Sequence, residues 1–281
     1  MVIERAPLED ELGDVLEKAM RLAGLGEAAL AARADVDAAR LSDALDYRPD
    51  FSADELRRLA AALGLNEVGL AALAAGRYPL PEIAGLPCCL YPLRTPHGVG
   101  VANAYLVADC PQAHALLFDT GADTALLRRV WPARIKTVDA IFITHAETEH
   151  LGGLAGVLAA NPGVPVYAPT EAAVPGARPL DEGVAVVVAG FAVRAWSTPG
   201  HAAAHNCYEV RATRAPAGAP LLLSGDLLFA GSAGGCYFSA PLLRAGLRRL
   251  FAELPDDTVV APGHGPLTTL GHERQFNPFV G

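Results

Sequence analysis

The sequence predicts a mixed α/β fold (α/β or α+β) with a small all-helical region in front of it. Residues 1–76 carry apolar side chains at the three-to-four spacing of amphipathic helices, and no β-rich run interrupts them. After the proline-rich stretch that follows, short β-rich runs alternate with helical runs, which is typical of a mixed sheet layered with helices. We therefore expect a helical domain over 1–76, a linker over 77–87 and an α/β domain over 88–281.

Composition indicates a globular protein outside the membrane. Of the 281 residues, 52% are hydrophobic and 19% are charged, which is ample for a sizeable core. No apolar run reaches the roughly 18 to 20 residues of a membrane helix, and the acidic N-terminus MVIERAPLEDELGD is unlike a signal peptide. We expect a cytoplasmic protein. The net charge of −9 disfavours non-specific attraction to nucleic acid or anionic membrane.

The helical region is expected to contain five short helices. Ser52, with Glu55 three residues later, predicts a capping box at the start of one of them. Glycines fall where helices would stop, at positions 24, 26, 64 and 76.

The segment 26–73 resembles the helix-turn-helix domain of the phage-repressor-like (XRE) family, with LAARADVDAARLSDAL as the two-helix reading unit. DNA binding is disfavoured by charge. Residues 1–78 hold nine Arg or Lys against fifteen Asp or Glu, and the stretch 34–46 has one arginine against four aspartates. DNA affinity comes largely from cations that neutralise phosphates. We therefore expect this region to form a homodimer or to cover the active site instead.

The stretch 76–96, GRYPLPEIAGLPCCLYPLRTP, is rich in proline and is interpreted as the connection between the two regions. The first elements expected beyond it are a hairpin of 103–108 with 114–121, a helix over TALLRRVW (124–131) and a buried strand over 138–144. A helix over 151–160 and a further strand over 164–169 follow.

The cysteines argue against a disulfide framework. There are five, an odd number, and none forms a CxxC pair. Free cysteine usually behaves as a small buried hydrophobe. Reduced thiols are therefore expected at positions 88, 89, 110, 207 and 236.

Ligand-type side chains cluster after β-rich runs. The stretch ITHAETEHLGG places four of them within six residues: His145, Glu147, Glu149 and His150. Their offsets fit neither one helix face nor one strand face, so they converge only from an irregular loop. Four more follow later β-rich runs: His201, His205, Asp226 and His264. Because rigid strands fix the loops that project ligands, the pattern predicts a metal site, half of it supplied by the first stretch.

Five motifs occur in the order and contexts of the metallo-β-lactamase superfamily: FDTG (118–121), THAETEHLGG (144–153), STPGHAAAH (197–205), SGDLLF (224–229) and APGHG (261–265). From Cys88 onward the chain resembles that superfamily, and the tail PDDTVVAPGHGPLTTLGHERQFNPFV looks like its glyoxalase-II-like branch. The resemblance implies an αββα sandwich with a dinuclear metal centre.

The resemblance also implies a role for each candidate residue. The ligands of one ion would be His145, Glu147 and His201. The ligands of the other would be Glu149, His150 and His264, with Asp226 bridging the two ions. Asp119 would orient ligands through hydrogen bonds, and His205 would either do the same or contact the substrate.

The opening motif departs from the family pattern. The usual motif is HxHxDH, and this chain has HxExEH, with glutamate at 147 in place of histidine and at 149 in place of aspartate. Both substitutions keep a metal-binding group, so two divalent or trivalent ions are still expected. The added carboxylate favours harder ions, so iron or manganese gains on zinc, which remains a candidate.

Two functions are compatible with this site. The first is a metal-dependent hydrolase of a small thioester, ester or lactone, in which a bridging hydroxide attacks the carbonyl and Glu149 orients that nucleophile and takes its proton. The candidate catalytic residues are Glu149 and Asp226. The second is a non-haem diiron protein that binds oxygen or nitric oxide, as oxidoreductase or sensor, because the flavo-diiron branch has glutamate at the second motif position. A binding module without chemistry is the third alternative. Candidate substrate contacts are Arg178 and Tyr237.

Overall fold

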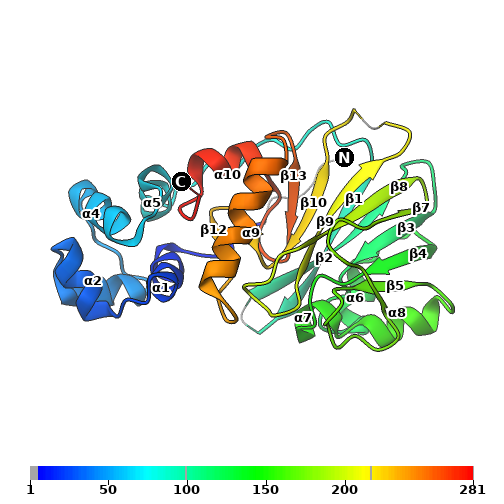
Figure 1. Ribbon diagram of the computed structural model, residues 1–281, viewed down its shortest axis with the longest axis horizontal. Helices are drawn as coiled ribbons and strands as arrows, with labels where there is room; N and C mark the ends of the chain where they lie inside the picture. The colour runs from blue at the N-terminus through cyan, green and yellow to red at the C-terminus, as the bar shows by residue number, and fades with distance from the viewer. Residues whose placement is uncertain (1–5, 99, 216, 281) are drawn as a thin grey trace.

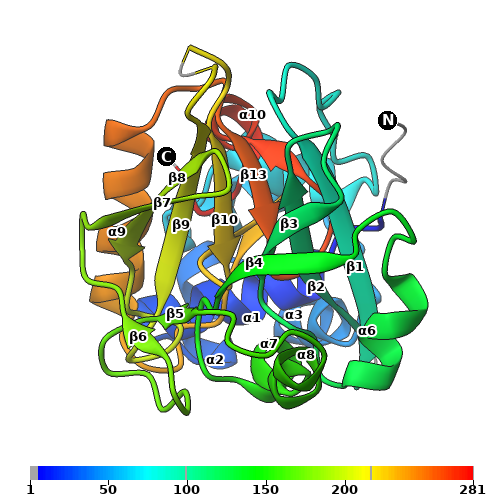
Figure 2. The ribbon, with the colours of Figure 1, turned by 90° about the vertical axis from the view of Figure 1, so that its right-hand side faces the viewer.

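Two six-stranded sheets stacked face to face make up the larger part of the computed structural model (Figures 1 and 2). The structure describes residues 6–98, 100–215 and 217–280, so the first five residues of the acidic N-terminus lie outside the described part. Helices cover the outer face of each sheet, which confirms the predicted αββα sandwich. No helix in the described ranges is both long and apolar enough to cross a membrane.

The first sheet has the strand order β1-β2-β3-β4-β5-β6. Its strands are β1 (Cys89–His97), β2 (Gly100–Ala108), β3 (His114–Phe118), β4 (Thr137–Phe142), β5 (Val166–Ala168) and β6 (Arg178–Pro179). Strands β2 and β3 form the predicted antiparallel hairpin, and β3 to β6 run parallel. The helices on this side are α6 (Thr124–Val130), α7 (Thr148–Leu151) and α8 (Leu154–Ala160).

The second sheet has the order β14-β13-β10-β9-β8-β7. Its strands are β7 (Ala185–Val188), β8 (Phe191–Ser197), β9 (Asn206–Ala212), β10 (Leu221–Gly225), β13 (Val259–Pro262) and β14 (Thr268–Thr269). The helices on this side are α9 (Ala240–Glu253) and α10 (Leu270–Phe276). A small ribbon pairs β11 (Leu228–Phe229) with β12 (Ser232–Ala233).

Aromatic side chains fill the space between the sheets. Phe118 and Phe142 stack with ring centroids 5.0 Å apart, and Tyr208 from the second sheet meets Phe142 at 5.5 Å. The Tyr208 hydroxyl donates a hydrogen bond of 2.7 Å to the carbonyl of Ile143, at the end of β4. The packed core thus holds the end of β4 in place, where the first ligand loop begins.

Five short helices form a bundle beside the second sheet (Figure 1): α1 (Leu12–Ala23), α2 (Glu27–Ala34), α3 (Ala38–Leu45), α4 (Ala53–Leu63) and α5 (Glu67–Ala74). The capping box of Ser52 and Glu55 at the start of α4 is confirmed. Gly24 and Gly64 end α1 and α4 in the left-handed conformation, whereas Gly26 is the residue at which α2 begins rather than a stop.

The bundle is docked on the sandwich through α5, α10 and the segment that follows α10. The backbone amide of Asn66 donates to the carbonyl of Pro278 at 2.8 Å, and its side chain donates to the carbonyl of Gln275 at 3.0 Å. Gly69 lies so close to α10 that an added Cβ would stand 1.8 Å from the carbonyl oxygen of Phe276. The close backbone approach explains why a glycine occupies the middle of α5.

Residues 89–96, at the end of the stretch interpreted as a connection, lie in strand β1 instead. The interpretation rested on prolines, two of which, Pro92 and Pro96, lie within this strand. Proline cannot donate to a sheet ladder and is therefore confined to edges, and β1 is an edge strand of the first sheet. The expectation was wrong because the prolines mark an edge strand.

A disulfide joins Cys89, at the start of β1, to Cys110, just past the end of β2, with the two Cα atoms 5.0 Å apart. Reduced thiols were expected at both positions, and that expectation is wrong. The antiparallel register pairs Cys89 with Ala108, which brings Cys110 within reach. The other three cysteines are free; Cys88 and Cys207 are buried and Cys236 is partly buried.

Candidate metal centre

Loops at one end of the sandwich bring the predicted ligands together. His145 follows β4, His201 follows β8, Asp226 follows β10 and His264 follows β13. Three groups have ligand atoms all within 4.8 Å of one another: His145 with Glu147 and His201, His145 with His150 and Asp226, and Glu149 with His150 and His264. All seven proposed metal ligands therefore lie in one cluster.

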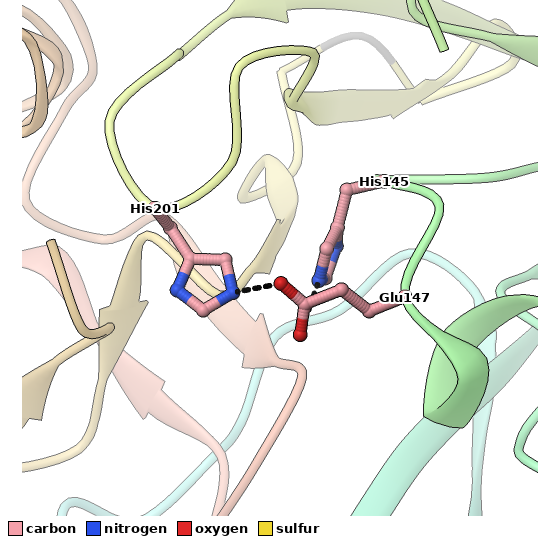
Figure 3. A group of neighbouring side chains, drawn as sticks. All are labelled: His145, Glu147 and His201. Atoms are coloured by element: carbon pink, nitrogen blue, oxygen red, sulfur yellow. Dashed lines mark ion pairs between the residues drawn. The ribbon is translucent and has the colours of Figure 1, made fainter. Parts of the chain in front are cut away.

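Glu147 lies between two imidazoles (Figure 3). Its Oε1 is 3.1 Å from Nε2 of His201 and its Oε2 is 3.9 Å from Nε2 of His145. His145 is fully buried, while the Glu147 side chain is 39% exposed. The carboxylate therefore reaches the two imidazoles from the open side of the cluster.

Asp226 lies at the centre of the cluster. Its Oδ1 is 3.4 Å from Nε2 of His150. Its Oδ2 is 3.7 Å from Nε2 of His201 and 3.4 Å from Nε2 of His264. One carboxylate thus faces histidines of both predicted ligand sets, which is the position a bridging ligand requires.

Hydrogen bonds at Nδ1 orient the imidazoles. Nδ1 of His201 lies 3.0 Å from the carbonyl of Gly235 and that of His264 lies 3.0 Å from the carbonyl of Val101. A carbonyl oxygen only accepts, so both rings carry their proton on Nδ1. Each Nε2 therefore faces the cluster, and in the neutral ring its lone pair points there, as in histidines that bind metals.

Several buried polar atoms of the cluster have no hydrogen bond. Among the described residues, no hydrogen bond of good geometry reaches the Nε2 atoms of His145, His150 and His201 or Oδ1 of Asp226, although carboxylate oxygens lie 3.1 Å from the His201 nitrogen and 3.4 Å from the His150 nitrogen. Burying a polar atom without a partner costs about 1 to 3 kcal/mol, and more when it is charged. A metal ion would compensate all four atoms, and this mixture of imidazole and carboxylate donors suits zinc, iron or manganese.

Electrostatics within the cluster are strongly coupled. Burial would raise the pKa of Asp226, but the imidazoles of His150 and His264 outweigh it and hold that pKa well below its usual range. Burial likewise opposes protonation of His150, yet the Asp226 and Asp119 carboxylates raise its pKa well above normal. Nearby positive charge thus stabilises the buried carboxylates, and bound cations would provide such charge.

Asp119 connects two of the ligand-bearing segments. It lies in the turn after β3 with φ at +56°. Its carboxylate accepts from the backbone amide and the hydroxyl of Thr144, both at 2.8 Å, and lies 3.1 Å from Nδ1 of His150. The side chain therefore fixes the start of the HAETEH loop and the orientation of one imidazole.

His205 is placed behind Asp226 and is only 1% exposed. Its Nε2 accepts a 3.1 Å hydrogen bond from the backbone amide of Asp226, and its Nδ1 lies 2.8 Å from the Thr198 hydroxyl. Burial lowers the pKa of His205 to about 3, so the ring is neutral. Of the two expected roles, this geometry fits orientation of Asp226, because the ring has no access to a substrate.

Glycines allow the ligand loops to approach one another. An added Cβ at Gly263, directly before His264, would stand 2.0 Å from Oδ1 of Asp226. One at Gly153 would stand 2.2 Å from the carbonyl oxygen of Thr120. Any larger side chain at these positions would push the loops apart.

Two residues near the cluster have no local signal in the sequence. Nε2 of His97, at the end of β1, lies 3.5 Å from Oε1 of Glu149. Oε1 of Glu9, from the segment before α1, lies 3.5 Å from Nδ1 of His264. Of the two candidate substrate contacts, Tyr237 lies with its ring 5.3 Å from the His201 ring, whereas Arg178 is exposed on strand β6.

The fold and the cluster define a protein of the metallo-β-lactamase kind. The metallo-beta-lactamase superfamily matches residues 97–264, more than half of the chain, and the chain belongs to that superfamily. Members of this family bind divalent metal ions, and the cluster above is where the described residues provide such ligands.

Several named members of this superfamily are similar to the chain. The hydroxyacylglutathione hydrolase of Salmonella arizonae is 35% identical over 127 residues, 45% of this chain and 47% of its own length. The chain therefore spans about half the length of this curated relative. The BLEG-1 B3 metallo-beta-lactamase superimposes with a TM-score of 0.56 and 28% identity, over 68% of this chain and 99% of that one. The di-iron-bound form of TTHA1623 superimposes with a TM-score of 0.54 and 31% identity, over 68% of this chain and 100% of that one.

Proposed function

We propose that the protein is a metal-dependent hydrolase that acts on a small thioester, ester or lactone through a dinuclear centre. The observation that carries the proposal is the set of four buried atoms without a hydrogen bond, on His145, His150, His201 and Asp226. Membership of the superfamily and the likeness to a hydroxyacylglutathione hydrolase support a hydrolytic reaction.

The proposed ligand sets follow the geometry of the cluster. One ion would be held by His145, Glu147 and His201, and the other by Glu149, His150 and His264. Asp226 would bridge them, since its two oxygens face histidines of both sets. With Glu147, Glu149 and Asp226 the centre has three carboxylates, which favours iron or manganese over zinc.

Bound divalent ions would polarise the carbonyl group of the substrate and lower the pKa of a bound water. The residues supply position and a route for the proton. Glu149 is proposed to take the proton of the attacking water, because its Oε1 lies 3.5 Å from Nε2 of His97, whose side chain is 38% exposed. The proton can then pass through His97 to solvent. Tyr237, beside His201, is proposed to line the substrate side of the centre.

The helical bundle is proposed to cover one side of the centre rather than to bind DNA. Three residues in or before α1 support this role. Glu9 reaches His264, Lys18 donates a 3.0 Å hydrogen bond to the carbonyl of Ala233, and the Arg21 guanidinium lies 5.3 Å from the Tyr237 ring. The relation to helix-turn-helix proteins and a homodimer through the bundle stay predictions from the sequence.

A panel of thioesters, esters, lactones and phosphodiesters tests the hydrolase. With iron, manganese or zinc loaded, the wild type should turn over at least one thioester, ester or lactone. His145→Ala should lower kcat/KM by about a thousandfold or more, since a metal ligand supplies several kcal/mol of transition-state stabilisation. The matched control is His114→Ala, a partly exposed histidine that pairs with Asp139 outside the cluster. A metal-loaded wild type inert to the whole panel would contradict the proposal.

A non-haem diiron protein that binds oxygen or nitric oxide is the second candidate. It is favoured by Glu147, a carboxylate in contact with both His145 and His201, and by the likeness to a di-iron-bound structure. Protein purified from iron-supplied cells would then contain iron and change its visible spectrum when oxygen or nitric oxide is added. Zinc alone, with no charge-transfer band in either redox state, would exclude this candidate.

A further inference from the structure

A cavity of about 760 Å³ lies between the helical bundle and helix α9. Its walls come from α1, the turn between α4 and α5, α9, α10 and the segment after α10. None of its lining residues belongs to the ligand cluster. Its volume is within the range of about 300 to 1,000 Å³ typical of sites for small molecules.

The floor of the cavity is apolar and is shared by two packed cores. Leu63 belongs to the core of the bundle, while Leu247 and Phe251 belong to the core between α9 and the second sheet. Phe279 packs against both of these cores and also lines the cavity. An apolar molecule bound here would therefore contact the bundle and the sandwich at once.

The charged residues that line the cavity are all arginines: Arg244, Arg248 and Arg274. Arg244 and Arg248 are exposed and one turn apart on α9, so they project from the same side of the helix. Within the described part of the chain neither makes a hydrogen bond or an ion pair. Arg274, in contrast, donates hydrogen bonds to the Asp256 carboxylate, at 2.9 Å, and to the carbonyl of Phe251, at 2.7 Å.

We propose that this cavity is a second binding site, for a small organic acid with an apolar body. The acid head, a carboxylate or a phosphate, would lie between Arg244 and Arg248, because the guanidinium fork matches both groups. The apolar body would lie on the floor formed by Leu63, Phe251 and Phe279. The site is independent of the metal centre, and its ligand would tie the bundle to the sandwich.

Titration of the full-length protein with decanoate, decyl phosphate and decanol tests the charge requirement. Calorimetry should show one saturable site per chain for decanoate or decyl phosphate, and the tighter of the two identifies the head group. Decanol should bind about tenfold more weakly or worse, the factor that corresponds to 1.4 kcal/mol. Decanol binding as tightly as both acids, or no saturable binding of any of the three, would overturn the proposal.

Two variants locate the site. Arg244→Glu combined with Arg248→Glu should weaken binding of the acid about tenfold or more, since charge-assisted hydrogen bonds are lost. Ala252→Trp should weaken it by filling the cavity while both arginines remain, because Ala252 is exposed on α9 and lines the cavity. The matched control is Arg33→Glu, an exposed arginine of α2 outside the cavity.

His145→Ala should keep the wild-type affinity for the acid, which separates this site from binding of a carboxylate at the metal centre. Circular dichroism confirms that each variant is folded. Unchanged affinity in both cavity variants, or loss of binding in His145→Ala alone, would refute the assignment.

Discussion

The helical bundle and the sandwich differ in what they bury. In the described residues 12–74 every buried side chain is apolar, as in Leu30 and Leu41. The sandwich buries a group of charged and polar side chains at one place, and several of their atoms have no hydrogen bond. Because such burial is costly, an all-apolar core reflects stability alone, whereas a buried polar cluster points to a bound ion. The chemistry of this protein is therefore expected in the sandwich.

The largest expected effect comes from Asp226→Ala. The substitution removes the carboxylate that faces both ligand sets, so we expect loss of both metal ions and a fall in kcat/KM of about a thousandfold or more. Metal content is measured by mass spectrometry, with turnover measured on the same samples. Asp54→Ala, which removes an exposed carboxylate of the bundle paired with Arg57, should change neither. Full metal content in Asp226→Ala would contradict the assignment of the metal site to the buried polar cluster of the sandwich.

Leu41→Ala tests the opposite region. Leu41 is fully buried in the bundle core, and loss of such a side chain costs about 2 to 5 kcal/mol of unfolding free energy. Urea unfolding should show this loss, while metal content and turnover at low temperature stay at wild-type values. If the metal is lost together with the stability, the two regions are not as separate as their cores indicate.

The next largest expected effect on the free energy of unfolding comes from the disulfide between Cys89 and Cys110, both of which lie in the sandwich. Replacing both Cys89 and Cys110 with serine opens a loop whose ends are 21 residues apart. We expect a loss of about 3 kcal/mol, measured by urea unfolding without reductant. Cys236→Ser, at a free and partly buried cysteine, should cost less than about 0.5 kcal/mol. Equal stability of the double variant and the wild type would show that the bridge does not form in solution.

Asp119→Asn should weaken metal binding without abolishing it. The carboxylate orients the His150 ring and the Thr144 backbone, and loss of such an outer partner typically costs about 10- to 100-fold in metal affinity. Competition with a chelator gives the affinity, and Asp139→Asn is the control outside the cluster. An unchanged affinity would mean that packing alone holds the HAETEH loop.

The smallest effect concerns the free thiols. Burial raises the pKa of Cys88 to about 11 and that of Cys207 to about 12. Since the thiolate is the reactive form, both should stay protonated and resist iodoacetamide at pH 8, and Cys88 should become reactive as the pH rises towards 11. Mass spectrometry of the native protein should find Cys236 labelled first. Rapid labelling of Cys207 at pH 8 would show that the core between α9 and the second sheet, where Cys207 lies, opens.

Local patterns predicted much of this structure. Helix periodicity and the Ser52 capping box predicted the bundle, and the β-rich runs predicted the sheets. The HAETEH stretch pointed to a metal site, and the structure brings its side chains together with His201, Asp226 and His264. The expectation that they converge only from an irregular loop is wrong for Glu149 and His150, which lie in the one-turn helix α7.

Features that depend on pairing between distant segments were not predictable in the same way. The partner of Cys89 is decided by the register of β1 on β2, not by cysteine spacing. Strand β1 was missed because Pro92 disrupts a central strand but is tolerated at an edge. Glu9 and His97 approach the cluster from segments that carry no ligand motif.

The contacts of Asn66 have a consequence for the order of events during synthesis. Its side chain binds the carbonyl of Gln275, which is translated 209 residues later. Domains generally fold as units from the N-terminal end while the chain is being made. The bundle can therefore be complete long before its docking partner exists, and the cavity beside α9 forms only after translation has passed Phe279.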